Sequence, residues 1–323
     1  MSHYLVTGGA GFIGSHLVER LLADGHRVTV LDDLSTGRMA NLSAVADHAK
    51  LQIIRDSVAT ERSVDLALSQ CDCVFHLASA VGVKLIVDKP VQTISTIIRG
   101  TETILESAYR YNRPVLITSS SEVYGKGTRV PFDEGDDVMM GPTAHTRWCY
   151  AYAKGIDEFL GLAYQRQFGL AVTIVRLFNT VGPRQVGMYG MVLPRFVEAA
   201  LRGDPLQVYG DGMQSRCFCH VSDVVDALIK LMDTPTARGQ VFNLGSSEEI
   251  TIEALANRVL KLTNSGSRID HVSLEQAYGQ RFDDLPRRVP KLDRIRAMIG
   301  FNPRRTLDQI IESVITEHRQ MLV

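Results

Sequence analysis

The sequence predicts an α/β protein built on a doubly wound parallel sheet, with a smaller C-terminal α/β lobe. Apolar strand-like runs alternate with helix-like patterns through the first half of the chain, and the first run ends in a glycine-rich turn. Such alternation is typical of parallel strands, because each strand returns to the sheet through a crossover helix. The predicted strands cover residues 4–7, 27–31, 51–55, 72–77, 114–119 and 171–177, and the predicted helices cover residues 12–24, 88–112 and 150–168.

The glycine-rich turn joins the first predicted strand to the first predicted helix. Gly8 permits the tight turn, Gly11 lets a pyrophosphate approach the backbone, and Gly14 lets the helix pack close to the strand. Unpaired amides and the helix dipole favour a phosphate at that helix end. Asp32 ends the next strand, where a carboxylate binds the adenosine ribose, which indicates NAD rather than NADP. The cofactor-binding residues predicted here are Gly8, Gly11, Phe12, Ile13, Gly14 and Asp32.

The chain changes character after Gly182, where Gly182-Pro183-Arg184-Gln185 interrupts the alternation. We expect a helix near residues 192–202, a strand at 205–209, a helix near 222–233 and a strand near 240–243. The last two are expected to return to the large sheet, and residues 250–300 to form most of the small lobe. The predicted division is an NAD-binding Rossmann domain of residues 1–178, to which 219–248 return, and a substrate lobe of residues 179–218 and 249–323.

Tyr150 and Lys154 lie one turn apart in the predicted helix 150–168, so their side chains share a face. The ordinary tyrosine pKa of about 10 is too high for a base at neutral pH. We expect the Lys154 ammonium and the positive nicotinamide ring to lower the pKa of Tyr150. Together with the glycine turn, the pair predicts that Tyr150 takes a substrate proton during hydride transfer.

Three serines and a glutamate follow the apolar strand Val115-Leu116-Ile117, at the strand end where this architecture builds its sites. We predict that Ser120 and Ser121 position the reacting oxygen and stabilise its developing charge. Glu122 adds a carboxylate beside them. The alternative interpretation is a solvated polar strand end.

Several ordered motifs together resemble the extended short-chain dehydrogenase/reductase family that acts on nucleotide sugars. The resemblance implies a doubly wound NAD-binding domain, a C-terminal substrate lobe, a nucleotide-sugar substrate (a UDP-sugar) and a homodimer. In this family the dimer forms through a four-helix bundle that includes the Tyr-x-x-x-Lys helix. The motifs are the glycine turn, Ser120-Ser121-Glu122-Val123-Tyr124-Gly125, the Tyr150–Lys154 pair, Arg176-Leu177-Phe178-Asn179, Gly182-Pro183-Arg184, and Gln214-Ser215-Arg216 before Val221-Ser222-Asp223.

The resemblance also implies a common first step at C4 of the sugar. Tyr150 would take the proton of the C4 hydroxyl while hydride passes from C4 to the nicotinamide. Ser120 and Ser121 would hold O4, and Glu122 would lie near C5 and help manage the proton returned there.

Further residues are predicted to bind the substrate and the cofactor. Asn179 would donate to the diphosphate, Arg216 would neutralise it, and Tyr209 would line the uracil pocket. Arg288 would bind either the diphosphate or the sugar carboxylate. The predicted substrate-binding residues are Val83, Lys84, Asn179, Arg195, Gln207, Tyr209, Arg216 and Arg288, and the additional cofactor-binding residues are Asp56, Ser57, Leu77, Ala78, Tyr150 and Lys154.

The run Ser120-Ser121-Glu122 distinguishes among the subgroups. Nucleotide-sugar 4,6-dehydratases carry an Asp-Glu pair after Thr, and Ser121 stands where their general acid would be. UDP-glucuronate decarboxylases carry Thr-Ser-Glu, which differs by one conservative change. Arg147-Trp148 and Arg287-Arg288 resemble the decarboxylase domain of the bacterial lipid A aminoarabinose pathway, where the arginine matching Arg288 is implicated in decarboxylation. The leading prediction is a UDP-glucuronate decarboxylase that works through a 4-keto intermediate.

Two alternatives stay open. Val81-Gly82-Val83-Lys84 resembles the nucleotide-sugar 4-epimerases, and Ile97 replaces an asparagine common in related enzymes. A 4-epimerase of UDP-glucose or UDP-glucuronate would use the same Tyr150 and NAD. The third interpretation is a non-catalytic NAD-binding regulator, against which the intact Tyr150–Lys154 pair counts.

The composition argues against several classes of protein. Lys and Arg number 35 against 36 Asp and Glu, so the net charge of −1 gives no basic field for nucleic acid or a membrane surface. No apolar run approaches transmembrane length, and no signal peptide is expected. Five cysteines (Cys71, Cys73, Cys149, Cys217 and Cys219) fit neither a disulfide framework nor zinc spacing. We therefore expect reduced thiols in the cytoplasm, no metal, and structural roles for His76 and His220.

Overall fold

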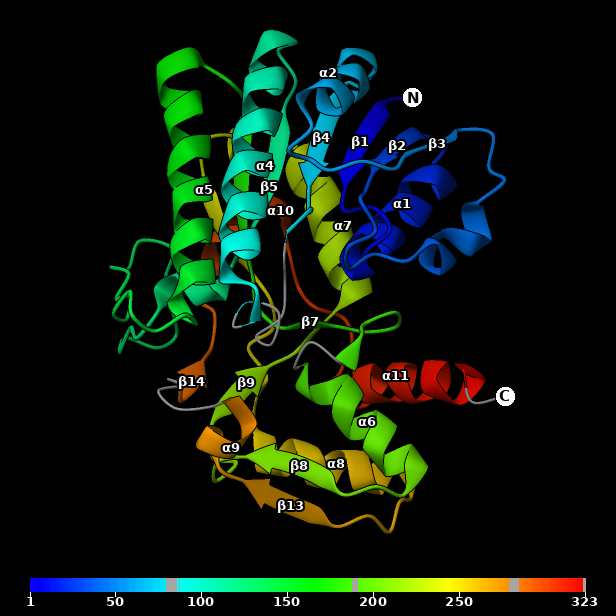
Figure 1. The fold of residues 1–323 in the computed structure, drawn as a ribbon, viewed down its shortest axis with the longest axis vertical. Helices are drawn as coiled ribbons and strands as arrows, with labels where there is room; N and C mark the ends of the chain where they lie inside the picture. The colour runs from blue at the N-terminus through cyan, green and yellow to red at the C-terminus, as the bar shows by residue number, and fades with distance from the viewer. Residues whose placement is uncertain (80–85, 87, 188–190, 279–284, 322–323) are drawn as a thin grey trace.

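Seven parallel strands form the central sheet of the computed structural model (Figure 1). The structure describes residues 1–79, 86, 88–187, 191–278 and 285–321. The strand order is β11 (Val241–Leu244), β6 (Val172–Leu177), β5 (Val115–Ser120), β4 (Cys73–His76), β1 (His3–Thr7), β2 (Arg27–Leu31) and β3 (Leu51–Ile54). Every neighbouring pair runs parallel, so all seven carboxyl ends lie at one edge of the sheet. The predicted fold class is confirmed.

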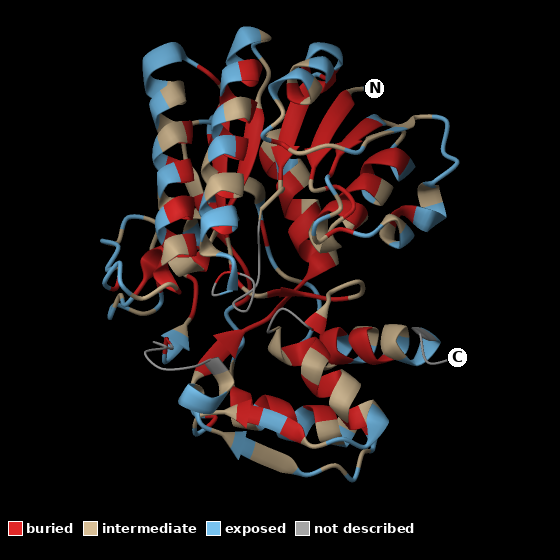
Figure 2. Ribbon diagram, in the orientation of Figure 1, coloured by how far each residue is buried: buried red, intermediate tan, exposed pale blue. Residues whose placement is uncertain are grey.

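Helices cover both faces of this sheet, and the buried strands between them are shown in red in Figure 2. Successive side chains of a strand point to opposite faces, so β1 contributes Val6 to one core and Leu5 to the other. On the Val6 side pack α1 (Phe12–Ala23), α7 (Val221–Met232) and α10 (Asp293–Ile299). On the Leu5 side pack α2 (Glu61–Gln70), α4 (Pro90–Arg110) and α5 (Trp148–Phe168).

The strands and helices predicted in the first half are confirmed to within two residues at either end. The sequence did not predict α2, whose buried apolar residues are only Val64, Ala67 and Leu68. The short 3-10 helices η1 (Met39–Val45), η2 (Ser121–Tyr124) and η4 (Pro235–Ala237) were not predicted either.

The second half divides between the large sheet and a separate core. As expected, α7 packs on α1, and β11 pairs with β6 in the large sheet. The separate core contains Leu206, Leu255 and Ile311 and lies below the large sheet in Figure 1. Its elements are α6 (Val192–Arg202), β8 (Leu206–Tyr209), α8 (Ile252–Thr263), β13 (Ile269–Val272) and α11 (Leu307–Met321). Of these, α6 and β8 were predicted and the others were not; the two-domain division of the chain stays a prediction.

Short strands lie between the large sheet and this separate core. β7 (Thr180–Val181) pairs with β10 (Cys219–His220), and β9 (Ser215–Cys217) is flanked by β12 (Glu249–Thr251) and β14 (Arg287–Arg288). α9 (Leu274–Tyr278) follows β13. Because β9 and β14 run side by side, Arg216 and Arg288 become partners in register. This pairing brings distant parts of the sequence to the carboxyl edge of the large sheet.

Candidate active site

A cavity of about 720 Å³ lies at the carboxyl edge of the large sheet. Most of the predicted site residues line it, whereas Ser57 does not, and Val83 and Lys84 lie outside the described residues. The predicted residues along its wall are Gly8, Gly11, Phe12, Ile13, Gly14, Asp32, Asp56, Leu77, Ala78, Ser120, Ser121, Glu122, Tyr150, Lys154, Asn179, Arg195, Gln207, Tyr209, Arg216 and Arg288.

One end of the cavity is the glycine turn. Gly8 has φ of +69°, a conformation that L side chains rarely adopt. A Cβ on Gly14 would lie 2.1 Å from the carbonyl oxygen of Gly8. Gly11 caps α1 without any side-chain hydrogen bond to the first helical amides. Bare backbone at a helix start therefore faces the cavity, which fits the phosphates of a dinucleotide.

Asp32 lies beside this turn. Its two carboxylate oxygens accept hydrogen bonds from the backbone amides of Ala10 (2.9 Å) and Leu34 (2.8 Å). Burial raises the pKa of Asp32 above its ordinary value, although the two amides oppose the shift. The amides fix both oxygens while leaving further lone pairs for ribose hydroxyls. This geometry fits the predicted contact with adenosine.

Asp56 follows β3 and also lines the cavity. Its carboxylate accepts from the backbone amide of Ser57 at 2.7 Å and from the hydroxyls of Thr60 and Ser63. These hydrogen bonds lower the pKa of Asp56. Ser57 therefore acts on Asp56 through its backbone rather than on the cavity itself.

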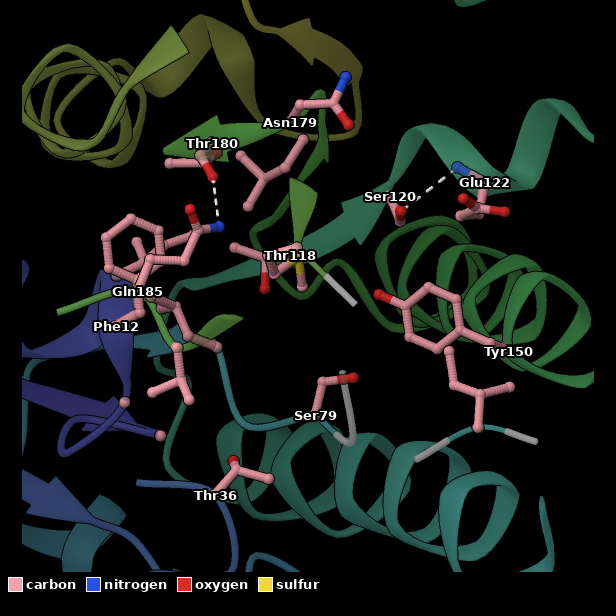
Figure 3. Close-up of a pocket in the computed structure, with 18 of the residues that line it drawn as sticks. Phe12, Thr36, Ser79, Thr118, Ser120, Glu122, Tyr150, Asn179, Thr180 and Gln185 are labelled. Carbon is pink, nitrogen blue, oxygen red and sulfur yellow. Dashed lines mark hydrogen bonds between the residues drawn. The ribbon is translucent and has the colours of Figure 1, made fainter. Parts of the chain in front are cut away.

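Tyr150 and Lys154 lie at the middle of the cavity on α5. The Lys154 side chain is 2% exposed, and its Nζ donates to the carbonyl oxygen of Thr118 (3.1 Å) and to Asp157 (3.2 Å). Figure 3 shows the Tyr150 hydroxyl pointing into the cavity on the side of Ser120 and Glu122.

The expected lowering of the pKa of Tyr150 by Lys154 is confirmed, but burial outweighs it. Burial is the largest influence and raises the pKa, whereas Lys154 and a hydrogen bond with Ser120 lower it by less. A charged neighbour can be predicted from spacing, but the depth of burial cannot. Any further decrease has to come from the positive charge of the bound cofactor.

The serines end β5 and begin η2. The Ser120 hydroxyl accepts from the backbone amide of Glu122 at 3.2 Å, drawn as a dashed line in Figure 3. Ser121 is 2% exposed and begins the 3-10 turn that carries Glu122. This turn places two hydroxyls and one carboxylate around the Tyr150 side of the cavity.

Glu122 is clamped between two arginines from distant parts of the chain. Its Oε2 accepts from Arg147 at 3.1 Å, and its Oε1 accepts from Arg288. Burial raises the pKa of Glu122, but the positive charges of neighbouring arginines, Arg288 first, outweigh burial and lower the pKa to about 2. Glu122 is therefore ionised at neutral pH in this arrangement, and its role toward a proton at C5 stays a prediction.

Arg147 is the main residue that sequence reasoning missed as a site residue. It lies just before α5, three positions from Tyr150, and its guanidinium lies 5.3 Å from the ring centre of the buried Trp148. The motif Arg147-Trp148 was noted from the sequence, and that motif was the available signal. Thr118, Thr180 and Gln185 also line the cavity without having been predicted.

The far end of the cavity carries the predicted nucleotide contacts. The Arg195 guanidinium lies 4.3 Å over the Tyr209 ring and donates to the carbonyl oxygen of Gln207. Arg216 donates to the backbone carbonyls of Ser215 and Leu285, both at 2.8 Å. The Asn179 amide donates to the carbonyl oxygen of Cys217 at 2.9 Å. The donors proposed for the diphosphate therefore have protein acceptors in this structure.

The two buried histidines have structural partners. His76 contacts the hydroxyls of Thr7 and Thr101, and burial lowers its pKa to about 3. Burial likewise lowers the pKa of His220, to about 4. Within the described residues, no group of three His, Cys, Asp or Glu side chains could hold a metal. No helix of the described part of the chain is both long and apolar enough to cross a membrane.

Comparisons with known proteins agree with this geometry. The chain is 43% identical over 318 residues to the UDP-N-acetyl-alpha-D-glucosaminuronate decarboxylase of Bacillus cytotoxicus, covering 98% of both proteins. It is 35% identical over 321 residues to UDP-glucuronic acid decarboxylase 1 of Xenopus tropicalis, covering 98% of this chain and 72% of that protein. The crystal structure of UDP-glucose 4-epimerase from Thermotoga maritima with UDP-glucose matches with a TM-score of 0.90 at 28% identity, covering 99% of this chain and 100% of that one.

The family assignment rests on the glycine turn, the Tyr150–Lys154 pair and the whole-chain likenesses together. The profile of the NAD dependent epimerase/dehydratase family matches residues 4–245. The chain belongs to the NAD dependent epimerase/dehydratase family, and its cofactor is NAD.

Proposed function

We propose that this protein is an NAD-dependent decarboxylase of a UDP-linked uronic acid, with UDP-glucuronate as the first candidate substrate. The observation that carries the proposal is the convergence of Arg147 and Arg288 on one carboxylate beside Tyr150. Positive charge at the sugar end of the cavity favours a sugar that itself carries a carboxylate. The relatives from Bacillus cytotoxicus and Xenopus tropicalis, both named as decarboxylases of such sugars, support the same substrate class.

The residues divide the reaction between them. The glycine turn and Asp32 would hold NAD, which would supply reversible hydride transfer at C4 of the sugar. The phenolate of Tyr150 takes the proton of the C4 hydroxyl, and the buried Lys154 ammonium stabilises that phenolate. Ser120 and Ser121 hold O4 as its charge develops. The resulting β-keto acid loses carbon dioxide as its C5–C6 bond breaks, while the arginines keep the carboxylate in place until it leaves. The enolate left behind takes a proton at C5 from water, and Tyr150 returns its proton to O4 when C4 is reduced.

The substituent at C2 of the sugar separates two candidate substrates. The relative from Bacillus cytotoxicus is named for a sugar that carries an N-acetyl group, and the relative from Xenopus tropicalis for glucuronic acid. Both sugars share the C4 hydroxyl and the carboxylate that the proposed chemistry requires. The proposal therefore covers both and ranks UDP-glucuronate first on the Ser121-Glu122 motif.

A 4-epimerase is the second candidate. The match to the UDP-glucose 4-epimerase of Thermotoga maritima favours it, because the two proteins share one fold over 99% of this chain. Decarboxylation is preferred over inversion of UDP-glucose because a neutral sugar gives Arg147 and Arg288 no carboxylate to bind. It is preferred over inversion of UDP-glucuronate because the two relatives named above are decarboxylases. A non-catalytic NAD-binding regulator is disfavoured by the buried, hydrogen-bonded Lys154 beside Tyr150.

Incubation with NAD and a panel of UDP-sugars, followed by mass spectrometry, tests the proposal. UDP-glucuronate, UDP-N-acetylglucosaminuronate and UDP-glucose form the panel. We expect loss of carbon dioxide from a uronate. Unchanged mass with a new retention time on UDP-glucose, and no decarboxylation of either uronate, would instead establish the epimerase. Absence of turnover with NAD bound would favour the regulator.

We also propose that the protein is a homodimer that pairs through α4 and α5. These helices lie side by side in Figure 1 and expose large apolar side chains on their outer face. Phe159 and Val91 are each 77% exposed, and Tyr152 and Ile156 continue the α5 stripe at helical spacing. Phe159→Asp should yield a monomer in sedimentation, whereas Met213→Asp, at an apolar residue exposed elsewhere, should leave a dimer. A dimeric Phe159→Asp protein would reject this interface.

The compartment we propose is the cytoplasm. All five cysteines are free thiols, and four of them are buried. Recovery of the protein with intact intramolecular disulfides from cells would count against this assignment.

A further inference from the structure

We propose that Arg147 and Arg288 form the binding site for the sugar carboxylate, and that Glu122 occupies this site as a surrogate carboxylate when substrate is absent. The inference rests on the proposed function, because only a uronate carries that carboxylate. It assigns Arg147 as a specificity-determining residue and gives Glu122 a role other than proton transfer.

The three side chains form a bridge across the cavity wall. Each oxygen of Glu122 accepts from a different guanidinium, Oε2 from Arg147 and Oε1 from Arg288. Glu122 belongs to η2, Arg147 to the start of α5, and Arg288 to β14. All three side chains are at most 18% exposed, and all three line the same cavity as Tyr150. One carboxylate thus holds two guanidiniums that come from separate parts of the fold.

Positive charge and hydrogen-bond donors at this bridge exceed what Glu122 alone neutralises and accepts. Two arginines share one anion, and Arg216 adds a third positive charge that acts on Glu122. The Arg288 Nε is buried and has no acceptor among the described residues. A buried donor without an acceptor is destabilising. A ligand oxygen at Arg288 would remove that cost.

Arg147 ties the carboxylate site to the catalytic base. Its guanidinium packs against Trp148, which is fully buried, so the side chain is held in place rather than free in solvent. Arg147 precedes Tyr150 by three positions, which puts the two side chains on adjacent turns at the start of α5. A carboxylate at Arg147 is therefore held close to the tyrosine that acts on C4, as a uronate requires.

Glu122 and the substrate carboxylate then compete for the same donors. Without an anion, two buried guanidiniums would lie side by side, which is costly. Glu122 prevents this in the unliganded site and must release donors when the sugar carboxylate arrives. Removing its charge should therefore tighten binding of a uronate while leaving a neutral sugar unaffected. A general acid or base at this position would show no such selective gain.

Calorimetry with NAD-loaded protein tests this, using UDP-glucuronate and UDP-glucose as ligands. All variants carry Tyr150→Phe, so that neither ligand is consumed. Arg147→Met should weaken UDP-glucuronate by about tenfold, the value of one charged hydrogen bond, and leave UDP-glucose unchanged. Arg147→Lys, which keeps the charge but loses the planar fork, should fall between. Glu122→Gln should strengthen UDP-glucuronate severalfold and leave UDP-glucose unchanged. Arg195→Met, a control at the Tyr209 end, should weaken both ligands equally.

Other outcomes decide against the inference. Equal weakening of both ligands by Arg147→Met would make Arg147 a general support of the site. Selective weakening of UDP-glucuronate by Glu122→Gln would show that Glu122 helps to bind the substrate. If Arg147→Met does not fold, the affinities of Arg147→Lys and Glu122→Gln for UDP-glucuronate and UDP-glucose test the same inference.

The inference and the proposed function fail separately. If the unmodified protein releases no carbon dioxide but prefers UDP-glucuronate through Arg147, the carboxylate site stands and the decarboxylase proposal fails. If carbon dioxide is released and the preference does not depend on Arg147, the decarboxylase stands and this site fails.

Discussion

The two ends of the cavity are built by different means. The cofactor end is made of backbone: Gly8, Gly11 and Gly14 form it within a few residues of one another, and Asp32 is held by two main-chain amides. The sugar end is made of charged side chains, since Glu122 meets an arginine 166 positions away along the chain. The cofactor end depends on the space that glycines leave, and the sugar end depends on long-range topology.

Two carboxyl groups show the electrostatic side of this difference. Asp32 and Glu122 are both largely buried and both line the cavity. Burial raises the pKa of Asp32, because backbone amides only partly compensate for lost solvation. Burial also acts on Glu122, yet the surrounding arginines lower its pKa to about 2. The neighbouring charges, more than the depth of burial, therefore decide the state of a carboxyl group here.

Tyr150→Phe should have the largest effect, because Tyr150 lies where the two ends meet. Loss of the phenolic oxygen removes the base, so turnover should fall by about a hundredfold to ten-thousandfold. NAD affinity should persist, because the glycine turn and Asp32 are untouched. Steady-state kinetics measure the turnover, and titration with NAD measures the cofactor affinity. Tyr152→Phe is the matched control: Tyr152 is 39% exposed on the same helix and should tolerate the change. Near-normal turnover of Tyr150→Phe would remove Tyr150 from the chemistry.

The pH dependence of turnover follows from the same residue. The phenolate form of Tyr150 becomes more populated as pH rises. Burial moves this transition to higher pH because it raises the pKa of Tyr150. We expect kcat/KM to rise with pH through this pKa, and Lys154→Met to shift the rise to higher pH because the ammonium opposes the effect of burial. Rate profiles of the two proteins give the comparison. A shift to lower pH in Lys154→Met would reverse the assigned role of the lysine.

Asp32→Asn should weaken the cofactor end alone. An asparagine has one carbonyl oxygen, so one of the two backbone amides loses its acceptor and the ribose loses a charged partner. NAD affinity should fall about tenfold to a hundredfold, and the preference over NADP should shrink. Asp47→Asn is the control, because Asp47 is exposed and does not line the cavity. Tighter binding of NADP than NAD by the unmodified protein would contradict the role of Asp32.

Gly14→Ala tests how far the cofactor end depends on bare backbone. The new Cβ would lie 2.1 Å from a backbone oxygen of Gly8, so the turn itself must shift. We expect a loss of about 1–3 kcal/mol in the free energy of unfolding, as for overpacked sites, together with weaker NAD binding. A Cβ on Gly266 meets nothing within 4 Å, so Gly266→Ala should be neutral in both measurements. Equal behaviour of the two variants would show that the turn adapts.

The sequence predicts the cofactor end well because its determinants are local. A strand, three glycines and an acid within about thirty residues indicate both the turn and its ligand. The Tyr150–Lys154 pair is equally predictable from the sequence, because helical spacing alone places the two side chains on one face. The family, the fold class and NAD were all predicted on this basis and are confirmed. The weakly apolar α2 was missed because its pattern is short.

The sugar end could not be predicted in the same way. Arg288 reaches Glu122 only because β14 pairs with β9 at the carboxyl edge of the sheet, and no local pattern reveals that pairing. The arginine partners of Glu122 were therefore not predicted. The net pKa of Tyr150 was not predictable for a related reason: spacing shows its lysine partner, whereas burial depends on the packing of distant elements.

The smallest expected effect is on the acid dependence of the free energy of unfolding, to which Glu122 and Asp32 should contribute with opposite signs. The folded pKa of Glu122, about 2, lies below its ordinary value of 4.5, so its ion pairs stabilise the fold above pH 4.5 and lose this contribution as pH falls toward 2. Asp32 has the opposite sign, because its raised pKa makes the ionised form costly in the folded state and acid removes that cost. Between about pH 5 and pH 3, unmodified protein should lose about 2 kcal/mol that Glu122→Gln does not lose. Asp32→Asn should instead lose more stability with acid than the unmodified protein does. Urea unfolding across this range measures all three slopes. Parallel plots of unfolding free energy against pH for Glu122→Gln and the unmodified protein would mean that the arginine pairs contribute no net stability. The two ends of the cavity would then differ in geometry but not in their electrostatic contribution to stability.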